Sequence, residues 1–442
     1  MRLDGPETSI NMGLKVARNG RIIDPSSGRN EIADLWFRDG KIINRPADNE
    51  AGKATEIDAK GQYLLPGLVD LHAHLCEPGY EYRETLVSGA NAAAAGGITG
   101  VACMPDTEPV IDNVPSVRFI HTQSAGTAVK IYPIAAITMG LRGAQLTESG
   151  ELAEAGVVAL SDGDRSIQNP AVLRRALEYT RMFDLPLMVH CEDSLLSAGG
   201  LMHEGTHSTR LGLRGLPSIS EETVAARDIM LAEWTRGRLH ITHVSTAVTV
   251  DLIRAAKKKG VRVTADVSPH HLILTDALLS TYDTNLKTNP PLRSDSDIEA
   301  LREGLSDGTI NAIASDHTPR SVDEKNTDFQ EALPGVLGFE TMLSAVYTEL
   351  VTPGHLTMLD VVKALSTAPA EILGVEGGVL EVGCPADFVL FEPDTTWTVD
   401  PTVFNSKSRN TPFTGRQLKG RVTKTIVDGR IRYRCGQLES SS

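Results

Sequence analysis

His72 and His74 lie at the end of an apolar run that begins at Leu64. In an extended strand alternate side chains point to the same face, so these two imidazoles share one face. Two imidazoles side by side can hold a divalent metal ion, although an isolated pair is equally often buried in a core or solvated. The pair becomes informative because metal-binding residue types recur at the ends of later apolar runs.

The central part of the chain, roughly residues 67–377, alternates eight apolar runs with segments whose apolar residues recur at helical spacing. The runs are 67–74, 100–105, 129–137, 157–162, 185–190, 239–243, 261–267 and 310–316. Eight strand–helix units predict a (β/α)₈ TIM barrel, which belongs to the α/β class. The carboxyl ends of its strands meet at one mouth, where barrel enzymes keep their active sites.

Residues that can bind metal stand at the carboxyl ends of five of these runs. They are His72, His74, Asp162, His190, His243 and Asp316. Imidazole and carboxylate together suit Zn²⁺ and, less exclusively, Mn²⁺, Co²⁺ or Fe²⁺. Six ligands are too many for one catalytic zinc, so we expect two ions that share a bridging carboxylate and a bridging hydroxide. Asp164 competes with Asp162 for the bridging position, and we favour Asp162 because it is closer to the strand.

The two ends of the chain, residues 1–66 and 378–442, have a different pattern from the middle. Short alternating runs are separated by Asn19-Gly20, Asp39-Gly40 and Asp428-Gly429. Such dipeptides favour tight hairpin turns, because both central positions of the turn need a positive φ. Each end alone is small for a core, so we expect the two ends to form one small composite β-sandwich domain around the barrel.

Composition excludes several classes of protein. The 442 residues carry a formal net charge of −14, so a general basic surface for nucleic acid is not expected. The five cysteines are scattered without a CxxC spacing, which favours neither a disulfide framework nor a zinc ribbon. The N-terminus has no apolar signal core, and no apolar stretch is long enough to cross a membrane. A cytoplasmic protein fits these features best.

The sequence resembles the amidohydrolase superfamily and, within it, the class I dihydroorotases. The matching segments cover nearly the whole length: 66–74, 77–79, 104–105, 190–193, 243–246, 289–293, 315–317 and 408–412. The resemblance implies the barrel, the β domain from both termini, and a reversible ring reaction between N-carbamoyl-L-aspartate and dihydroorotate.

By position, the resemblance implies a role for each metal-type residue. His72 and His74 bind the first metal ion, Asp162 bridges, His190 and His243 bind the second, and Asp316 touches the first and acts as acid and base. Hydantoinases, dihydropyrimidinases and allantoinases usually bridge with a carboxylated lysine. Residues 157–164 contain no lysine, which resembles the aspartate-bridged branch of the dihydroorotases.

Three positions that contact substrate in the family differ here. Cys76 replaces an arginine that grips the substrate carboxylate, Asp106 replaces an asparagine, and Arg320 replaces a histidine. Arg320 could reach the same carboxylate, or it could pair with Asp106 and leave a pocket for a neutral ring. The family's other substrate contacts are retained: His74, Asn289, Pro334 and Gly335.

Three functions therefore stay open at this point. The first is a dihydroorotase with a rearranged carboxylate grip, and the second is a hydrolase of another cyclic amide, imide or ureide. The third is a non-catalytic scaffold for aspartate carbamoyltransferase, although such scaffolds typically lose metal ligands. A homodimer and an assembly with aspartate carbamoyltransferase are possible for an active enzyme as well, and residues 321–329 have the polar composition of a lid or surface loop.

Overall fold

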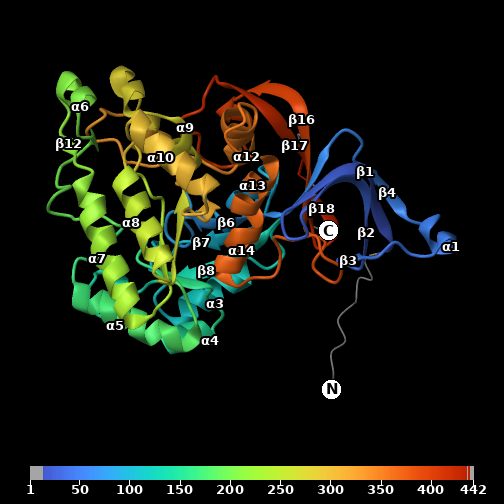
Figure 1. Ribbon diagram of the computed structural model, residues 1–442, viewed down its shortest axis with the longest axis horizontal. Helices are drawn as coiled ribbons and strands as arrows, with labels where there is room; N and C mark the ends of the chain where they lie inside the picture. Colours follow the sequence, from blue (N-terminus) through green and yellow to red (C-terminus); the bar gives the residue numbers. More distant parts are fainter. Residues whose placement is uncertain (1–12, 436, 439–442) are drawn as a thin grey trace.

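The structure, a computed structural model, describes residues 13–435 and 437–438. Eight parallel strands form the barrel sheet in the order β15-β14-β13-β10-β9-β8-β7-β6 (Figure 1). They are β6 (Leu68–Ala73), β7 (Ile98–Cys103), β8 (Lys130–Ala135), β9 (Ala159–Ser161), β10 (Leu187–Val189), β13 (Leu239–Ile241), β14 (Val263–Val267) and β15 (Ala312–Ile313). Seven of the eight predicted runs contain one of these strands, and the run 100–105 overlaps β7, which begins two residues earlier. A parallel bridge between Ala73 and His317 joins the two ends of the sheet and closes the barrel.

A helix follows each barrel strand, and these helices form the outer layer (Figure 1). They are α2 (Leu86–Ala95), α3 (Val114–Gln123), α4 (Ser149–Glu154), α5 (Pro170–Thr180), α7 (Ile219–Thr235), α8 (Ala247–Lys258), α10 (Asp295–Ser306) and α12 (Met342–Val346). Short helices lie in the loops: α6 (Thr206–Leu211), α9 (Pro269–Ile273) and α11 (Val322–Lys325). The chain leaves the barrel through α13 (Met358–Val362) and α14 (Ala368–Leu373).

Helix starts follow local sequence rules. At α10, the Ser294 side chain accepts a hydrogen bond from the Asp297 amide, and the Asp297 carboxylate accepts one from the Ser294 amide. This reciprocal cap satisfies two backbone donors that the helix leaves free and is worth about 1 kcal/mol. A comparable cap starts α2 at Thr85.

Barrel strands bury both of their faces. Inward-facing side chains fill the barrel, among them Leu71, Met104, Ile134 and Met188. Outward-facing side chains such as Leu68 and Val101 pack under the helices in the largest apolar cluster. The strands are consequently apolar without alternation, as expected for a parallel sheet that is covered on both sides. The strands also bury some polar side chains, such as Asp70, His240 and Asp266, and histidine and aspartate side chains gather where the strands end, at the mouth.

Strands from both ends of the chain form a second sheet. Its order is β19-β18-β17-β16-β5-β1-β2-β3, and β4 pairs with β1. The strands are β1 (Lys15–Asp24), β2 (Arg29–Arg38), β3 (Lys41–Ile43), β4 (Thr55–Asp58), β5 (Tyr63–Pro66), β16 (Phe388–Thr398), β17 (Gln417–Val427), β18 (Arg430–Arg434) and β19 (Gln437–Leu438), and the short helix α1 (Asp48–Ala51) precedes β4. The composite β domain is therefore present, while its proposed limits at residues 66 and 378 remain a prediction.

Two of the three expected hairpin turns are found. Asp39-Gly40 joins β2 to β3 and Asp428-Gly429 joins β17 to β18, each with positive φ at both residues. The turn expected at Asn19-Gly20 is wrong, because these residues lie inside β1, where the register of pairing with β2 shifts. Asn19 has a φ of 60° there, so the dipeptide forms a bulge and not a turn.

The β domain holds the first barrel strand in place. Only Gly67 separates β5 from β6, and a Cβ atom at this position would lie 2.2 Å from the Thr99 hydroxyl oxygen. Lys130 on β8 donates to the buried Asp387 carboxylate at 2.8 Å, which ties the barrel to the start of β16. His72 thus lies on a strand that is fixed by both sheets.

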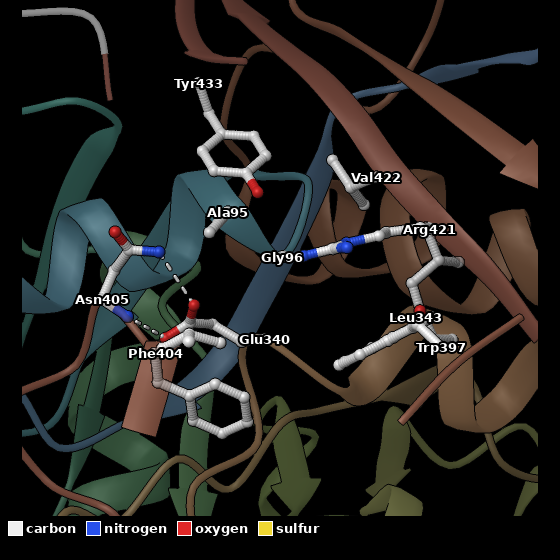
Figure 2. A pocket seen from close by; sticks show the side chains of 12 residues that line it. Ala95, Gly96, Glu340, Leu343, Trp397, Phe404, Asn405, Arg421, Val422 and Tyr433 are labelled. Carbon is white, nitrogen blue, oxygen red and sulfur yellow. Dashed lines mark hydrogen bonds between the residues drawn. The ribbon is translucent and has the colours of Figure 1, made fainter. Parts of the chain in front are cut away.

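A cavity of about 360 Å³ lies between the barrel and the β domain (Figure 2). Figure 2 shows Glu340 beside Asn405, and the side chains of Trp397, Arg421 and Tyr433 around the same space. None of the described residues that line it belongs to the predicted metal or substrate set. The candidate chemistry lies elsewhere, at the mouth of the barrel.

Candidate metal centre at the barrel mouth

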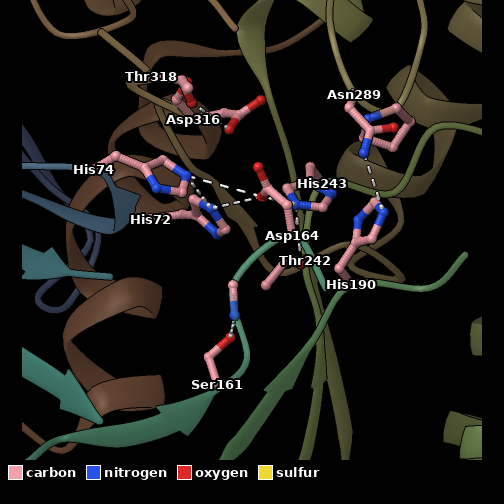
Figure 3. A network of polar contacts seen from close by, with 12 residues as sticks. His72, His74, Ser161, Asp164, His190, Thr242, His243, Asn289, Asp316 and Thr318 are labelled. Atoms are coloured by element: carbon pink, nitrogen blue, oxygen red, sulfur yellow. Dashed lines mark hydrogen bonds and ion pairs between the residues drawn. The ribbon is translucent and has the colours of Figure 1, made fainter. Parts of the chain in front are cut away.

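Histidine and aspartate side chains from five strand ends meet at the mouth (Figure 3). The Nε2 atoms of His72 and His74 lie 3.3 Å apart. Asp164 Oδ1 lies 3.8 Å from each of these nitrogens and 4.0 Å from His243 Nε2. Asp316 offers an oxygen within 4.8 Å of ligand atoms of His72 and His74. Four of the six predicted metal residues therefore lie in one cluster.

Asp162, the favoured bridging residue, faces the Thr138 turn. Its Oδ1 accepts a hydrogen bond from the Thr138 amide at 2.9 Å, and its Oδ2 accepts one from the Thr138 hydroxyl. Asp164 lies two residues farther along the loop and points at the histidines (Figure 3). Gly163 makes this possible, because its φ of 63° turns the chain back toward the barrel axis. Nearness to the strand was a poor guide to which aspartate reaches the centre.

His190 lies beside the cluster and outside its tightest groupings. Its ring centroid is 4.9 Å from that of His243. Its Nε2 lies 3.0 Å from Glu192 Oε2 and 3.5 Å from the Asn289 side-chain nitrogen. Its Nδ1 is buried and has no hydrogen-bond partner within the described part of the chain. Asn289 thus reaches the mouth, as expected for a substrate-contacting residue.

Several buried polar atoms in the cluster have no hydrogen-bond partner among the described residues. They are Nδ1 of His72, His190 and His243 and Oδ1 of Asp164. Buried polar atoms normally find hydrogen bonds, so unpaired atoms in a group call for an explanation. Tetrahedral zinc with bonds near 2.05 Å places neighbouring ligand atoms about 3.3 Å apart. The separation of the His72 and His74 Nε2 atoms equals that spacing, and the Asp164 distances exceed it by about 0.5–0.7 Å, so the donor set fits a metal such as zinc.

Asp316 is buried at the end of the eighth strand. Burial raises the pKa of its carboxyl to about 7, and His72 opposes the rise while Asp164 adds to it. The carboxylate lies 3.4 Å from His270 Nε2. It therefore has a protonation equilibrium near neutral pH in the metal-free protein, and cations bound beside it would lower that pKa.

Asp106 contacts a histidine of the cluster. His74 Nδ1 lies 2.8 Å and 2.9 Å from the two Asp106 oxygens. Burial lowers the pKa of His74, but the Asp106 carboxylate more than offsets this effect and the pKa rises to about 9. Burial likewise raises the pKa of Asp106, and the attraction of His74 outweighs it and brings the value to about 2. Asp106 thus fixes the ring orientation of His74, as carboxylates do behind metal-bound histidines.

The other two unusual positions also have defined contacts. Arg320 donates from Nε to the Pro334 carbonyl at 2.7 Å and forms no ion pair with Asp106 within the described residues. Cys76 is buried with a φ of 63°, and burial raises the pKa of its thiol beyond the ordinary range. Gly335 uses its amide for Lys287 O and its carbonyl for the Asn410 side chain. Pro334 and Gly335 therefore contact protein groups in this structure.

Buried carboxylates behind the mouth position the cluster, and sequence reasoning gave them no role. Asp70 accepts hydrogen bonds from the Ser315 amide and hydroxyl, which ties the strand of His72 to the strand before Asp316. Asp266 accepts from the His243 amide at 2.7 Å and pairs with His240. His270 follows β14, so the rule that found the other residues at strand ends would have found it too.

Comparisons with known proteins agree with this geometry. The family described as Dihydro-orotase-like matches residues 61–248, and the Amidohydrolase family matches residues 219–433. A dihydroorotase from Pelotomaculum thermopropionicum is 50% identical over 414 residues, which is 94% of this chain and 97% of that protein. One from Syntrophotalea carbinolica is 48% identical over 417 residues, covering 94% of this chain and 98% of its own.

The chain belongs to the dihydroorotase family. Identity of this degree over nearly the full length of both proteins confirms the resemblance drawn from the motifs. Among solved structures, the L-hydantoinase (dihydropyrimidinase) from Arthrobacter aurescens superposes with a TM-score of 0.86 at 26% identity and covers 96% of this chain and 97% of its own. In the described part of this family member, no helix has the length and apolar character needed to span a bilayer.

Proposed function

We propose that this protein is a dihydroorotase, a metal-dependent hydrolase that interconverts dihydroorotate and N-carbamoyl-L-aspartate. The observation that carries the proposal is the convergence of His72, His74, Asp164, His243 and Asp316 at the barrel mouth. Curated relatives named dihydroorotase support the choice of reaction. A scaffold without catalysis would have no need to keep this complete set of ligand-type side chains.

We further propose which residues hold the metal. His72, His74 and Asp316 form one group of ligand atoms, and His72, Asp164 and His243 form a second group that has His72 in common with the first. Asp164 lies between the groups and takes the bridging role that the sequence assigned to Asp162. His190 completes the second group through its unpartnered Nδ1. One or two zinc ions bound there would polarise the ring carbonyl and lower the pKa of the attacking water.

Asp316 is the proposed acid and base. It takes a proton from the attacking water as the new C–O bond forms, and it gives this proton to the ring nitrogen as the C–N bond breaks. Asp316 is only 6% exposed, so its carboxyl has little contact with bulk water. In the reverse direction the same carboxyl accepts the proton from the carbamoyl nitrogen and returns it to the departing water.

Substrate anchoring is the part of the site in which this chain differs from its family. The thiol of Cys76 cannot supply the paired hydrogen bonds that a guanidinium gives a carboxylate. Asp106 is already committed to His74. Arg320 remains the cation of the predicted substrate set, and its terminal nitrogens are the proposed carboxylate contact together with Asn289. Arg320→Ala should then raise the KM for carbamoyl aspartate strongly, and an unchanged KM would rule out this contact.

A hydrolase of an uncharged cyclic imide or ureide is the second candidate. Two features favour this second candidate: Asp106 pairs with His74, and Cys76 stands where the family usually has an arginine. Both leave less positive charge in the site to bind a substrate carboxylate. The deciding experiment offers zinc-reconstituted protein either dihydroorotate and carbamoyl aspartate or hydantoin and dihydrouracil. Turnover of the first pair supports the dihydroorotase, and turnover of the second pair alone supports the other hydrolase.

The expected partners remain proposals. A homodimer and an assembly with aspartate carbamoyltransferase rest on the family resemblance. Cytoplasmic location likewise remains a prediction from composition. Sedimentation of the protein with and without the carbamoyltransferase tests both assemblies.

A further inference from the structure

The cavity of about 360 Å³ between the barrel and the β domain shares no described lining residue with the metal centre (Figure 2). Its walls come from α2 and α12 of the barrel and from β16, β17 and β18 of the second sheet. Val403 also lines it and is 67% exposed, so the cavity opens to solvent on that side. The volume is at the small end of the range for ligand pockets. Most of the wall is apolar or aromatic: Ala95, Leu343, Trp397, Phe404, Val422 and Tyr433.

Arg421 reaches into this cavity without an acidic partner. Figure 2 shows its guanidinium group pointing from β17 toward Gly96. Its Cζ atom lies 5.4 Å from the centre of the Trp397 ring, and the Trp397 indole is itself fixed by a hydrogen bond to Gly420 O at 3.0 Å. Within the described residues, Arg421 forms no hydrogen bond and no ion pair within 4.0 Å. A guanidinium is a planar fork of N–H donors that matches a carboxylate, so Arg421 offers an unused anchor for an anionic group.

Glu340 is the only acid among the described residues of the lining, and no cation of that part of the chain lies within 4.0 Å of it. Its Oε1 accepts hydrogen bonds from the Asn405 amide at 2.7 Å and the Ser406 amide at 3.2 Å. Its Oε2 accepts a single bond from a described residue, the Asn405 side chain at 2.9 Å. Burial raises the pKa of the Glu340 carboxyl to about 7, although these hydrogen bonds oppose the rise. A carboxylate oxygen can accept about two hydrogen bonds, so Oε2 has room for one further donor.

We propose that this cavity binds a small aromatic carboxylate that carries an N–H donor at the opposite end of its ring. The carboxylate pairs with Arg421, and the N–H group donates to Glu340 Oε2. The ring between them packs against Leu343, Phe404 and Val422. An inorganic anion would leave the apolar wall unfilled, and an uncharged ring would leave Arg421 without a counterion, so this class of ligand matches all parts of the wall. The site uses none of the metal-binding residues and does not depend on the proposed function.

The test is calorimetric titration of the zinc-loaded full-length protein with 4-aminobenzoate, whose carboxylate and amine lie at opposite ends of one ring. Benzoate, which lacks the donor, and aniline, which lacks the carboxylate, are the matched ligands, and both should bind more weakly. Arg421→Gln removes the fork, and we expect it to weaken binding of 4-aminobenzoate about 10-fold or more. Arg416→Gln is the matched control, because Arg416 is also half-buried against an aromatic ring, that of Phe413, and does not line the cavity. The affinity of this control variant should equal that of the wild type.

Each outcome has a defined meaning. Binding of 4-aminobenzoate that depends on Arg421 and exceeds the binding of benzoate and aniline supports the site. No binding by the wild type, or equal binding by the Arg421→Gln variant, overturns the proposal. Equal affinities for 4-aminobenzoate and benzoate overturn the donor contact with Glu340, and displacement of the probe by carbamoyl aspartate places it at the metal centre and overturns the site. Because the readout is binding, a protein that fails to hydrolyse dihydroorotate still tests the cavity.

Discussion

Replacing Asp164 by asparagine should weaken zinc binding, whereas the same change at Asp162 should not. Asp164 Oδ1 lies 3.8–4.0 Å from three histidine nitrogens and has no hydrogen-bond partner among the described residues. Structural zinc sites with four ligands bind with about 10–16 kcal/mol, or roughly 2.5–4 kcal/mol per ligand. The Asp164 side chain is 32% exposed and asparagine keeps one weak oxygen ligand, so we expect a loss of about 2 kcal/mol, near 30-fold in affinity.

Asp162→Asn is the matched control. Both Asp162 oxygens accept hydrogen bonds from Thr138, so asparagine loses one acceptor and leaves a buried donor facing another donor. The expected cost is about 1–3 kcal/mol of folding stability with unchanged zinc affinity. Chelator competition on reconstituted protein gives the affinities, and urea unfolding gives the stabilities. Wild-type zinc binding by the Asp164 variant, together with zinc loss by the Asp162 variant, would refute the assignment.

Three further changes test other parts of the structure. Asp106→Asn should weaken zinc binding about 10-fold, which is at the low end for a carboxylate behind a metal-binding histidine because the Asp106 side chain is 38% exposed. Chelator competition measures this affinity best near pH 9, because the pKa of His74 lies there and fewer protons then compete with zinc for its ring. An unchanged affinity would contradict the positioning role of Asp106. Lys130→Met should lower the free energy of unfolding, measured in urea, by about 3–5 kcal/mol, because it leaves the buried Asp387 carboxylate without its cation. Adding Asp387→Asn should recover part of this loss. A Lys130→Met variant as stable as the wild type would contradict this reasoning. Burial raises the pKa of Asp228 from 3.8 to about 6, so the folded state holds a proton that the unfolded state releases, and stability falls by up to about 3 kcal/mol as pH rises through that interval. Asp228→Asn should remove this fall, and equal pH dependence of both proteins in urea unfolding between pH 4 and 7 would count against it.

The barrel was predictable because its signals are local. Each apolar run is only five to nine residues long. The metal-type residues stand at the ends of these runs, which a parallel barrel brings together at one mouth. Strand alternation predicted that His72 and His74 share a face, and the recurrence of histidine and aspartate at later strand ends made them candidate metal ligands. The hairpins at Asp39 and Asp428 followed from the φ values that their turns demand. The bulge at Asn19 did not, because the same dipeptide serves a turn or a bulge according to strands that pair with it from elsewhere.

The details of the site depended on distant contacts. The choice between Asp162 and Asp164 is set by Thr138, which lies on another loop and holds one carboxylate away from the centre. The contact of Asp106 with His74 joins residues 32 positions apart. The sequence marked Asp106 as unusual, but only the fold showed that it faces His74.

The central claim is that the histidine–aspartate cluster binds metal ions that make a cyclic amide hydrolase of this barrel. Zinc titrated into chelator-stripped protein, with dihydroorotate ring opening followed at each addition, tests this claim most directly. We predict no turnover in the stripped protein and a rise in rate that levels off at one or two equivalents of zinc per chain. Turnover by the stripped protein would contradict the claim. A fully zinc-loaded protein that opens neither dihydroorotate nor an uncharged ring such as hydantoin or dihydrouracil would contradict it as well.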